Sequence, residues 1–430
     1  MAESYSLEQS QEVEVIDLLD QLCHLQKQLI LNKATSEGST EQRNKLVHQV
    51  HCASRRLSLA SQQPHEAFWD LIRRCSLISP IRIAQDMGVF RHLQNHGGGT
   101  AKLLAESLGA EEGLVGRILR PLVAEGLLAQ SAQGVYEVTK HGSVFGLPAY
   151  EDSCKFAVEF LPVVLFNPTF FHQYGYREPR SHEGLHTPLA TYFQKPGYGF
   201  FDYIDDHPSV QKFFISAMHA QVRTKSLSCS VYDYGTQAMP VTDDVSRVAI
   251  VDVGGSRGEL LQDIQARYPQ LKGRMIVQDR ESTFQDMEQP PPGIQLMVHD
   301  IFTEQPVKGA AIYHLKRILH DWGDDEARII LKHLVSAMDR KWSKVLIMDS
   351  VGPHFETSDT SKILIWRMSQ VLPSTDISLS QAMSDHSMLT FGGKERSEGE
   401  WIELLTSVGL TVLHIHQGPE PEALIECRKA

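Results

Sequence analysis

A glycine-rich stretch follows an apolar run in the second half of the chain. Val248 to Val253 is almost continuously apolar and β-branched, as in a parallel strand that is covered on both faces. Gly254, Gly255 and Gly258 come next, and glycines let a backbone turn tightly and approach a ligand without interference from a Cβ. The stretch therefore predicts a strand, a ligand-binding turn and a helix, in that order.

Two acids at the ends of the next apolar runs indicate what the turn binds. Asp279 ends the run that begins at Met275, where a carboxylate can accept hydrogen bonds from both hydroxyls of a ribose. Asp300 ends the following run and suits the exocyclic amine of a purine. The chain lacks a Walker lysine after the glycines and lacks the Gly-x-Gly-x-x-Gly spacing of a dinucleotide fold. These features favour S-adenosylmethionine (SAM) over NAD or ATP.

Aromatic side chains are dense in residues 148–240, directly before the glycine turn. Aromatic residues at helical spacing are typical of a helical core, but such a layer also suits the wall of a pocket for a flat, apolar substrate. The candidates for substrate contact are Phe214, Met218 and His219.

The elements that must position these residues form a repeating pattern in residues 241–430. Apolar runs alternate with helical segments, as in a doubly wound parallel sheet. A helix is predicted from Asp324 to Arg340, and a hairpin of two strands is predicted at the C-terminus. The insertion from Pro353 to Ser387 is long for a connection and is expected to cover the site.

The first 147 residues are mainly helical. Residues 1–65 show helical apolar spacing that is interrupted between Thr35 and Thr40, so two amphipathic helices are predicted, as a dimer or lid element. Residues 66–147 have a winged-helix pattern. Its predicted elements are helices over Ile81–Phe90, Thr100–Gly109 and Glu111–Glu125, followed by a strand over Gly134–Val138.

Winged helices often bind DNA, but the third predicted helix carries only Arg117 and Arg120 as cations, which favours dimerisation. The formal net charge is −12, and no lysine or arginine cluster makes a phosphate-binding stripe, which argues against a nucleic-acid partner.

Composition and cysteine spacing indicate what kind of protein this is and where it is expected to be located. The 430 residues are 42% hydrophobic and 22% charged, enough for two or three cores. We expect no apolar run of membrane-spanning length and no signal peptide, because the first residues are acidic and polar. The six cysteines are scattered without metal-binding spacing, so we expect reduced thiols, no metal and a cytoplasmic location.

Four motifs together resemble one family. They are Val251–Gly255, Asp300–Phe302, the His-Asp-Trp motif within Tyr313–Asp325, and the Gly-Lys-Glu-Arg motif within Phe391–Ser397, which Trp401 follows. In this order they are similar to the plant-type, caffeic-acid-like SAM-dependent O-methyltransferases, over residues 66 to 428. The N-terminal helices and the insertion resemble the fungal secondary-metabolite members.

The resemblance implies a catalytic set and a fold. His320 would be the general base that takes the proton from a substrate hydroxyl, and Asp349 and Glu395 would orient and polarise it. The implied fold is an α/β Rossmann-like class I methyltransferase domain after an N-terminal, mainly helical winged-helix dimerisation domain. The implied partners are a second copy of the chain and a small aromatic or polyketide-like substrate. The lengths of the apolar runs add the expectation of no membrane association.

The resemblance also implies SAM contacts. The matching positions are Gly254 in the turn, Asp279 on the ribose, Asp300 near the adenine and Lys316 toward the methionine end. Ser256 stands where the family commonly has glycine. Two residues that each follow an acid, Arg280 and Ile301, should pack near the adenosine.

A second kind of chemistry stays open. Some fungal relatives keep SAM but catalyse dehydrations and pericyclic ring closures, with the sulfonium acting as a fixed positive charge. In several of them the histidine position has become another residue such as arginine. The presence of His320 with both acids favours methyl transfer over a pericyclase, and a non-enzymatic winged-helix regulator is the third alternative.

Overall fold

The protein is described here by a computed structural model that covers residues 2–34, 40–179, 186–222, 227–238, 247–271, 273–285, 287, 289–352, 379–417 and 422–430. The chain divides into two compact units, Met1–Gly146 and Leu147–Ala430. The predicted break at Thr35 to Thr40, except Thr40 itself, and most of the insertion from Pro353 to Ser387 lie outside the described residues.

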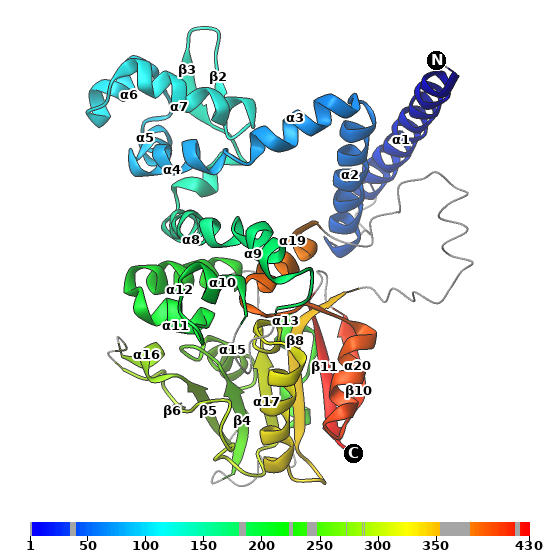
Figure 1. The fold of residues 1–430 in the computed structure, drawn as a ribbon, viewed down its shortest axis with the longest axis vertical. Coiled ribbons are helices and arrows are strands. Elements are labelled where there is room, and N and C mark those ends of the chain that lie inside the picture. The colour runs from blue at the N-terminus through cyan, green and yellow to red at the C-terminus, as the bar shows by residue number, and fades with distance from the viewer. Residues whose placement is uncertain are drawn as a thin grey trace. The chain divides into compact units, whose positions relative to one another are not determined.

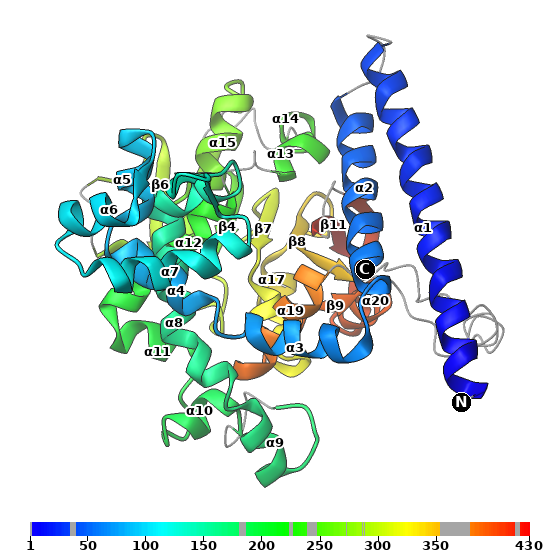
Figure 2. The same cartoon turned by 90° about the horizontal axis from the view of Figure 1, so that it is seen from above.

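The first unit begins with two long helices, α1 (Ala2–Ala34) and α2 (Thr40–Ala60), which lie side by side in both views (Figures 1 and 2). Leu18, Leu25 and Ala53 are buried on these helices. The helix α3 (Pro64–Arg74) follows, and its described side chains all remain at least partly exposed.

A winged-helix arrangement completes the first unit. Its helices are α4 (Ile78–Asp86), α5 (Val89–His96), α6 (Ala101–Leu108) and α7 (Glu112–Ala124), and a 3-10 turn, η1 (Gly142–Gly146), ends it. A three-stranded sheet has the order β1 (Gly99–Thr100), β3 (Val135–Val138), β2 (Leu128–Gln130). The predicted helix over Ile81–Phe90 is wrong as a single element, because Gly88 takes a left-handed φ of 77° and separates α4 from α5.

The second unit begins with helices that hold the aromatic-rich segment. They are α8 (Pro148–Val164), α9 (Asn167–Tyr174), α10 (Pro188–Tyr192), α11 (Phe200–Asp206), α12 (Pro208–Val222), α13 (Leu227–Val231) and α14 (Tyr234–Gln237). Phe160, Phe200 and Tyr203 are buried in one cluster with Phe391, whose ring stacks on that of Phe200 at 4.7 Å. The aromatic density therefore builds a core.

One segment corrects the expectation about membrane-spanning length. Pro148–Tyr174, which includes α8 and α9, is long and apolar enough to cross a membrane by length and composition alone, with a mean hydropathy of 1.3. The turn after Val164 separates its two helices, and 22% of the most apolar window is buried inside the protein, including Phe160 and Phe170. The core helices of soluble proteins pass the same test, so the segment is weak evidence for a membrane span.

The rest of the second unit is a Rossmann-like α/β domain, as predicted. Its main sheet has the order β10-β11-β8-β7-β4-β5-β6, which can be followed in Figure 1. The strands are β4 (Val248–Val253), β5 (Arg274–Asp279), β6 (Ile294–Val298), β7 (Ile312–Lys316), β8 (Lys344–Gly352), β10 (Leu410–Gln417) and β11 (Glu422–Lys429). The strands β4 to β8 pair in parallel, whereas β10 and β11 form the predicted antiparallel hairpin.

Helices cover both faces of this sheet. They are α15 (Glu259–Arg267) on one face and α17 (Asp324–Ala337) and α20 (Glu398–Ser407) on the other. Two more helices of the unit are α16 (Glu281–Phe284), after β5, and α19 (Leu379–Met388), before the Gly-Lys-Glu-Arg motif. One buried cluster joins Val251 and Leu315 to α17 and to Trp401 of α20, and a second joins Ile250 to Tyr234 and to α15. The helix predicted from Asp324 to Arg340 ends three residues early, because the backbone becomes extended at Met338.

Candidate active site

The predicted site residues gather where parallel strands end. The glycine turn follows β4, Asp279 ends β5, and Lys316 ends β7. Asp349 lies on β8 one position beyond Met348, the residue that is opposite Lys316. Ligands of open α/β sheets bind outside the carboxyl ends of such strands, so this edge is the expected site.

The turn after β4 requires glycine for steric reasons. Gly254 has a φ of 70°, and a Cβ added there would lie 2.4 Å from Cδ1 of Ile318. A Cβ added to Gly255 would lie 2.4 Å from Oδ2 of Asp252. The amides of Gly254 and Gly255 donate to the carbonyl of Gln278 at 2.8 and 3.1 Å, which fixes the turn against β5.

Asp279 is held rigidly beside this turn. It accepts hydrogen bonds from the amides of Ser256 and Arg280, each at 2.8 Å, and from the hydroxyl of Thr283 at 2.7 Å. Ser256, which stands where the resemblance expects glycine, adopts a left-handed φ of 53°. The serine therefore keeps the turn closed onto Asp279, whose oxygens still have acceptor capacity for a ribose.

The other predicted cofactor positions differ in their surroundings. Asp300 accepts a hydrogen bond from the amide of Phe302 at 3.0 Å, and Ile301 packs against the core. Lys316 is half-buried at the end of β7. Arg280 points to α11, where it pairs with Asp205 and lies 4.8 Å from the ring of Phe201.

The three predicted catalytic residues converge. His320 lies in a 3-10 turn, η3 (Leu319–Asp321), between β7 and α17. Its Nδ1 lies 3.0 Å from Oε1 of Glu395 and 3.8 Å from Oδ1 of Asp349. Ser384 of α19 donates to the same Oε1 at 2.9 Å. A histidine and two carboxylates within 4.8 Å of one another could also hold a metal ion.

A fourth titratable residue, Asp321, belongs to this cluster and was not predicted. Its Oδ1 lies 3.5 Å from Nε2 of His320, and the two side chains are 16% and 12% exposed. The signal was present in the His-Asp-Trp motif itself. The tryptophan of that motif, Trp322, contacts Phe201 and Phe302, with ring centroids 5.8 and 4.7 Å apart.

The acids set the protonation state of the cluster. Burial alone would lower the pKa of His320, but the charges of Asp321, Asp349 and Glu395 raise it to about 10. Burial raises the pKa of Asp349 to about 7 and that of Asp321 to about 6. Burial would also raise the pKa of Glu395, but its hydrogen bond with His320 lowers it. The resting cluster therefore holds its proton on His320.

The predicted substrate contacts receive different surroundings. Phe214 lies in the aromatic cluster, with its ring 5.4 Å from that of Phe156 and 5.3 Å from that of Phe200. Met218 is half-buried on the same helix, α12. His219 lies on α12, but its side chain is outside the described part of the chain.

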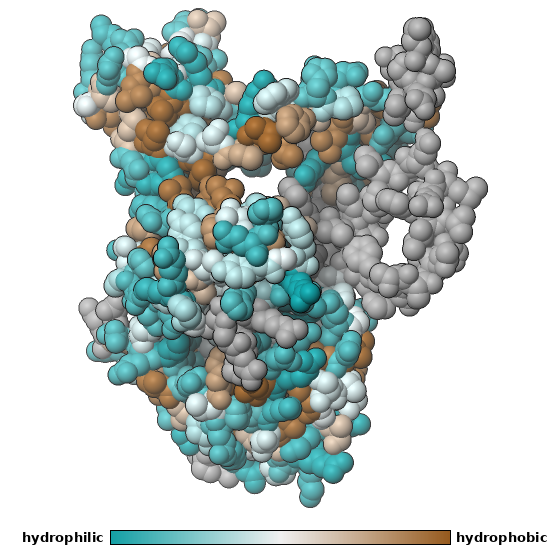
Figure 3. Space-filling model, viewed as in Figure 1, coloured by the Kyte–Doolittle hydropathy of each residue, from teal (hydrophilic) through white to brown (hydrophobic). Residues whose placement is uncertain are grey.

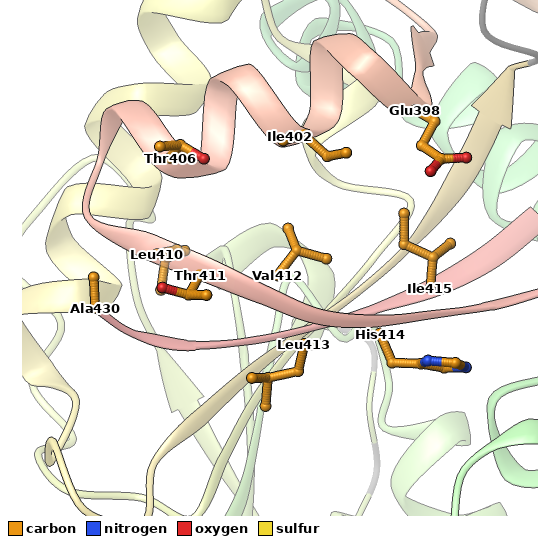
Figure 4. A pocket seen from close by; sticks show the side chains of 10 residues that line it. All are labelled: Glu398, Ile402, Thr406, Leu410, Thr411, Val412, Leu413, His414, Ile415 and Ala430. Atoms are coloured by element: carbon orange, nitrogen blue, oxygen red, sulfur yellow. The ribbon is translucent and has the colours of Figure 1, made fainter.

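A pocket between α20 and β10 lies on another part of the unit (Figure 4). Ile402 of α20 faces Val412 and Ile415 of the edge strand β10 across it. None of the described residues that line it belongs to the predicted site. The strands β11 and β8 separate this edge strand from β7, which leads to His320.

Comparisons with known proteins agree with the motifs. A family model described as the O-methyltransferase domain matches residues 181–411, and one described as the O-methyltransferase dimerisation domain matches residues 69–146. Methyltransferase cfoC of Aspergillus candidus is 30% identical over 362 residues, which are 80% of this chain and 82% of that protein. Demethylsterigmatocystin 6-O-methyltransferase of Aspergillus parasiticus is 30% identical over 386 residues, which are 84% and 89% of the two chains.

Solved structures share the fold. OxaC in complex with SAH and oxaline has a TM-score of 0.80 and 24% identity, over 98% of this chain and all of that one. A structure described as a pericyclic reaction enzyme has a TM-score of 0.79 and 23% identity, over 96% of this chain and all of that one. On the domain match and the relatives, the chain belongs to the SAM-dependent O-methyltransferase family.

Proposed function

We propose that this enzyme methylates a hydroxyl of an aromatic or polyketide-type small molecule, with His320 as the general base. The observation that carries the proposal is the cluster of His320, Asp349 and Glu395 at the strand edge that also holds the glycine turn. Its relatives' names point the same way, since demethylsterigmatocystin 6-O-methyltransferase denotes methylation of an oxygen on a small molecule.

The cofactor fits the other half of this edge. The positive φ of Gly254 supports a close approach of the backbone to a ligand, and we assign Asp279 to the ribose, Asp300 to the adenine and Lys316 to the methionine end. SAM supplies a methyl group that is already activated by its sulfonium. We assign Arg280 to the wall of this site rather than to a direct contact, because it is held by Asp205 and Phe201.

The proton has a defined route. Because Nδ1 of His320 engages Glu395, Nε2 is the nitrogen that can accept the proton of a substrate hydroxyl. A phenol has a pKa of about 10, so an ordinary histidine would face an uphill transfer of roughly 5 kcal/mol. The surrounding acids raise the pKa of His320 to about 10, which removes most of this mismatch.

The raised pKa also has a cost. With this pKa, only a small fraction of His320 is deprotonated at neutral pH, unless another positive charge in the site lowers the pKa. The sulfonium of bound SAM is such a charge. We therefore propose that SAM binding precedes proton abstraction.

The second candidate is a pericyclase or dehydratase-type cyclase that uses the sulfonium as an electrostatic catalyst. The fold of the pericyclic reaction enzyme, at a TM-score of 0.79, is the observation that favours it. The three acids around His320 favour methyl transfer, because a ring closure needs no base of this strength.

We also propose a homodimer and a cytoplasmic location. The helix α3 carries four exposed large apolar side chains, Phe68, Trp69, Leu71 and Ile72. Figure 3 shows hydrophobic surface over the part of the first unit where Figure 1 draws this helix. This helix overlaps the matched dimerisation domain, and burying such a face against a second copy would remove it from water. The first two helices would add area to the same interface.

The test is mass spectrometry with methyl-labelled SAM and a panel of phenolic and hydroxypyridone acceptors. We expect label in the product and S-adenosylhomocysteine as the second product. His320→Ala should abolish turnover, by about 10³-fold or more, with SAM affinity nearly unchanged. A product of altered structure without label would instead support the pericyclase, and loss of SAM binding in the folded variant would contradict the role of His320.

A further inference from the structure

The turn that carries His320 is too short to hold its own geometry. The 3-10 turn η3 comprises three residues, and isolated turns of this length are not stable on their own. Arg317, just before it, has a left-handed φ of 53°. The position of the imidazole must therefore be fixed from outside the turn.

The Gly-Lys-Glu-Arg loop fixes it through backbone carbonyls on both sides of the histidine. Nη1 of Arg396 donates to the carbonyl of Leu319, and Nη2 donates to the carbonyl of Trp322, each at 2.8 Å. The amide of Lys394 donates to the carbonyl of His320, also at 2.8 Å. Gly393 permits this approach, because a Cβ there would lie 2.5 Å from the same carbonyl oxygen.

The guanidinium that binds these carbonyls is fully buried. The Arg396 side chain is 0% exposed, and its Nε donates to Oδ1 of Asp324 at 2.9 Å. Its guanidinium lies 5.2 Å from the ring centroid of Trp401. A buried charge is costly unless it is paired and hydrogen-bonded, and here the guanidinium has a carboxylate and two carbonyls as partners.

The same loop brings Glu395 to the imidazole and pairs with the strand that carries Asp349. Glu395 lies between Lys394 and Arg396, so the residues that bind the turn flank the carboxylate that binds Nδ1. Arg396 also begins β9 (Arg396–Ser397), which pairs in parallel with β8 at Val351, two residues beyond Asp349. One residue thus ties together the three segments that carry His320, Glu395 and Asp349.

We infer that Arg396 is the positioning residue of the general base and sets the distance between His320 and its acids through the carbonyls of Leu319 and Trp322. The inference rests on the proposed function, in which His320 is the base. Arg396 acts through the turn rather than on the substrate.

The first test is Arg396→Lys in the full-length enzyme. Lysine keeps the charge but cannot present two parallel donors to two carbonyls. We expect kcat at saturating SAM to fall by about 10- to 100-fold, since a misplacement of about 1 Å can cost about 10²-fold. The dissociation constant of SAM should stay within about twofold. The matched control is Arg328→Lys, which changes an arginine of α17 that pairs with Asp325 and Ser407.

The second readout separates positioning from mere stability. Asp321, Asp349 and Glu395 face His320 from η3, β8 and the loop before β9, and they raise its pKa. Displacing the turn weakens these contacts, so the imidazole of Arg396→Lys should titrate at lower pH in histidine-labelled NMR spectra. The acid limb of the profile of kcat against pH should also move to lower pH. A smaller folded fraction would instead lower kcat by the same factor at every pH.

Asp324→Asn is a milder second variant, which keeps the inference testable if Arg396→Lys does not fold. Asp324 is 39% exposed, and asparagine keeps an acceptor for Nε of Arg396 but removes the paired charge, while both carbonyl contacts remain. We expect the same downward shift at smaller amplitude. An unchanged His320 titration in both variants would overturn the inference. The NMR readout needs no turnover, so it stays decisive even if His320→Ala retained activity and the proposed function failed.

Discussion

The two halves of the sheet's carboxyl edge differ in how their acidic side chains are hydrogen-bonded. On the side of β4 and β5, Asp279 beside the glycine turn accepts three hydrogen bonds, from the amides of Ser256 and Arg280 and from the hydroxyl of Thr283. On the side of β7 and β8, both oxygens of Asp349 and Oε2 of Glu395 lack a hydrogen-bond partner among the described residues. A carboxylate that several donors hold in place, such as Asp279, is rigid and suits binding, whereas buried and unpartnered acids beside a histidine shift pKa values and suit proton transfer.

Asp279→Asn tests the binding half and has the largest expected effect of the three changes below. The NH2 group of asparagine would face either the amide of Ser256 or, in the other orientation, the amide of Arg280 and the hydroxyl of Thr283, and the substitution would remove the charge offered to the ribose. We expect the dissociation constant of SAM, measured by calorimetry, to rise about 100-fold.

In that variant, kcat at saturating SAM should change little. The control is Asp263→Asn, an exposed acid on α15 that should leave SAM binding unchanged. If kcat fell and SAM affinity did not, the division between a binding half and a proton-transfer half would be wrong.

Glu395→Gln tests the proton-transfer half. The substitution keeps the size of the side chain and removes one of the charges that raise the pKa of His320. The imidazole then becomes a weaker base that loses its proton at lower pH. We expect kcat to fall about tenfold at its plateau and its acid limb to move to lower pH.

The measurement is kcat against pH at saturating SAM, with Glu398→Gln, an exposed acid at the start of α20, as the control. An acid limb that stayed in place would mean that Glu395 does not set the protonation of His320. SAM affinity should be unchanged in both variants, because Glu395 lies outside the glycine turn.

The two halves also differed in how far the sequence could predict them. The glycine turn and Asp279 follow from local backbone rules, so spacing alone located them. His320 and Glu395 are 75 positions apart, and no local rule joins them; the family resemblance was needed to pair them. Arg396 and Asp321 were missed although both lie inside the quoted motifs, because their contacts with backbone carbonyls and with a neighbouring ring exist only in the folded chain.

The sequence also predicted some parts of the fold better than others. Periodicity predicted the alternating sheet and the terminal hairpin, which depend on long apolar patterns. It misjudged the segment Ile81–Phe90, where the single left-handed glycine at Gly88 ends one helix and begins another. Aromatic density could not distinguish a core from a pocket, and Phe214 is packed among other aromatic rings of the core cluster.

Asp349→Asn should show the smallest effect of the three changes, and it should stabilise the protein although it lowers kcat. Burial raises the pKa of Asp349 to about 7, so the folded protein holds this proton more tightly than the unfolded chain does. Ionisation therefore costs stability, with a penalty that grows as pH rises from about 4 to about 7 and stays in full above that. Asparagine cannot ionise, so Tm should rise by roughly 2–4 °C at about pH 8.5 and by less at about pH 5.5, while kcat falls.

Calorimetric scans at both pH values check this against Asp325→Asn, which changes an acid on α17 that is 79% exposed. An equal gain at both pH values would show that Asp349 is an ordinary ionised acid, and the contrast between the two halves of the edge would disappear.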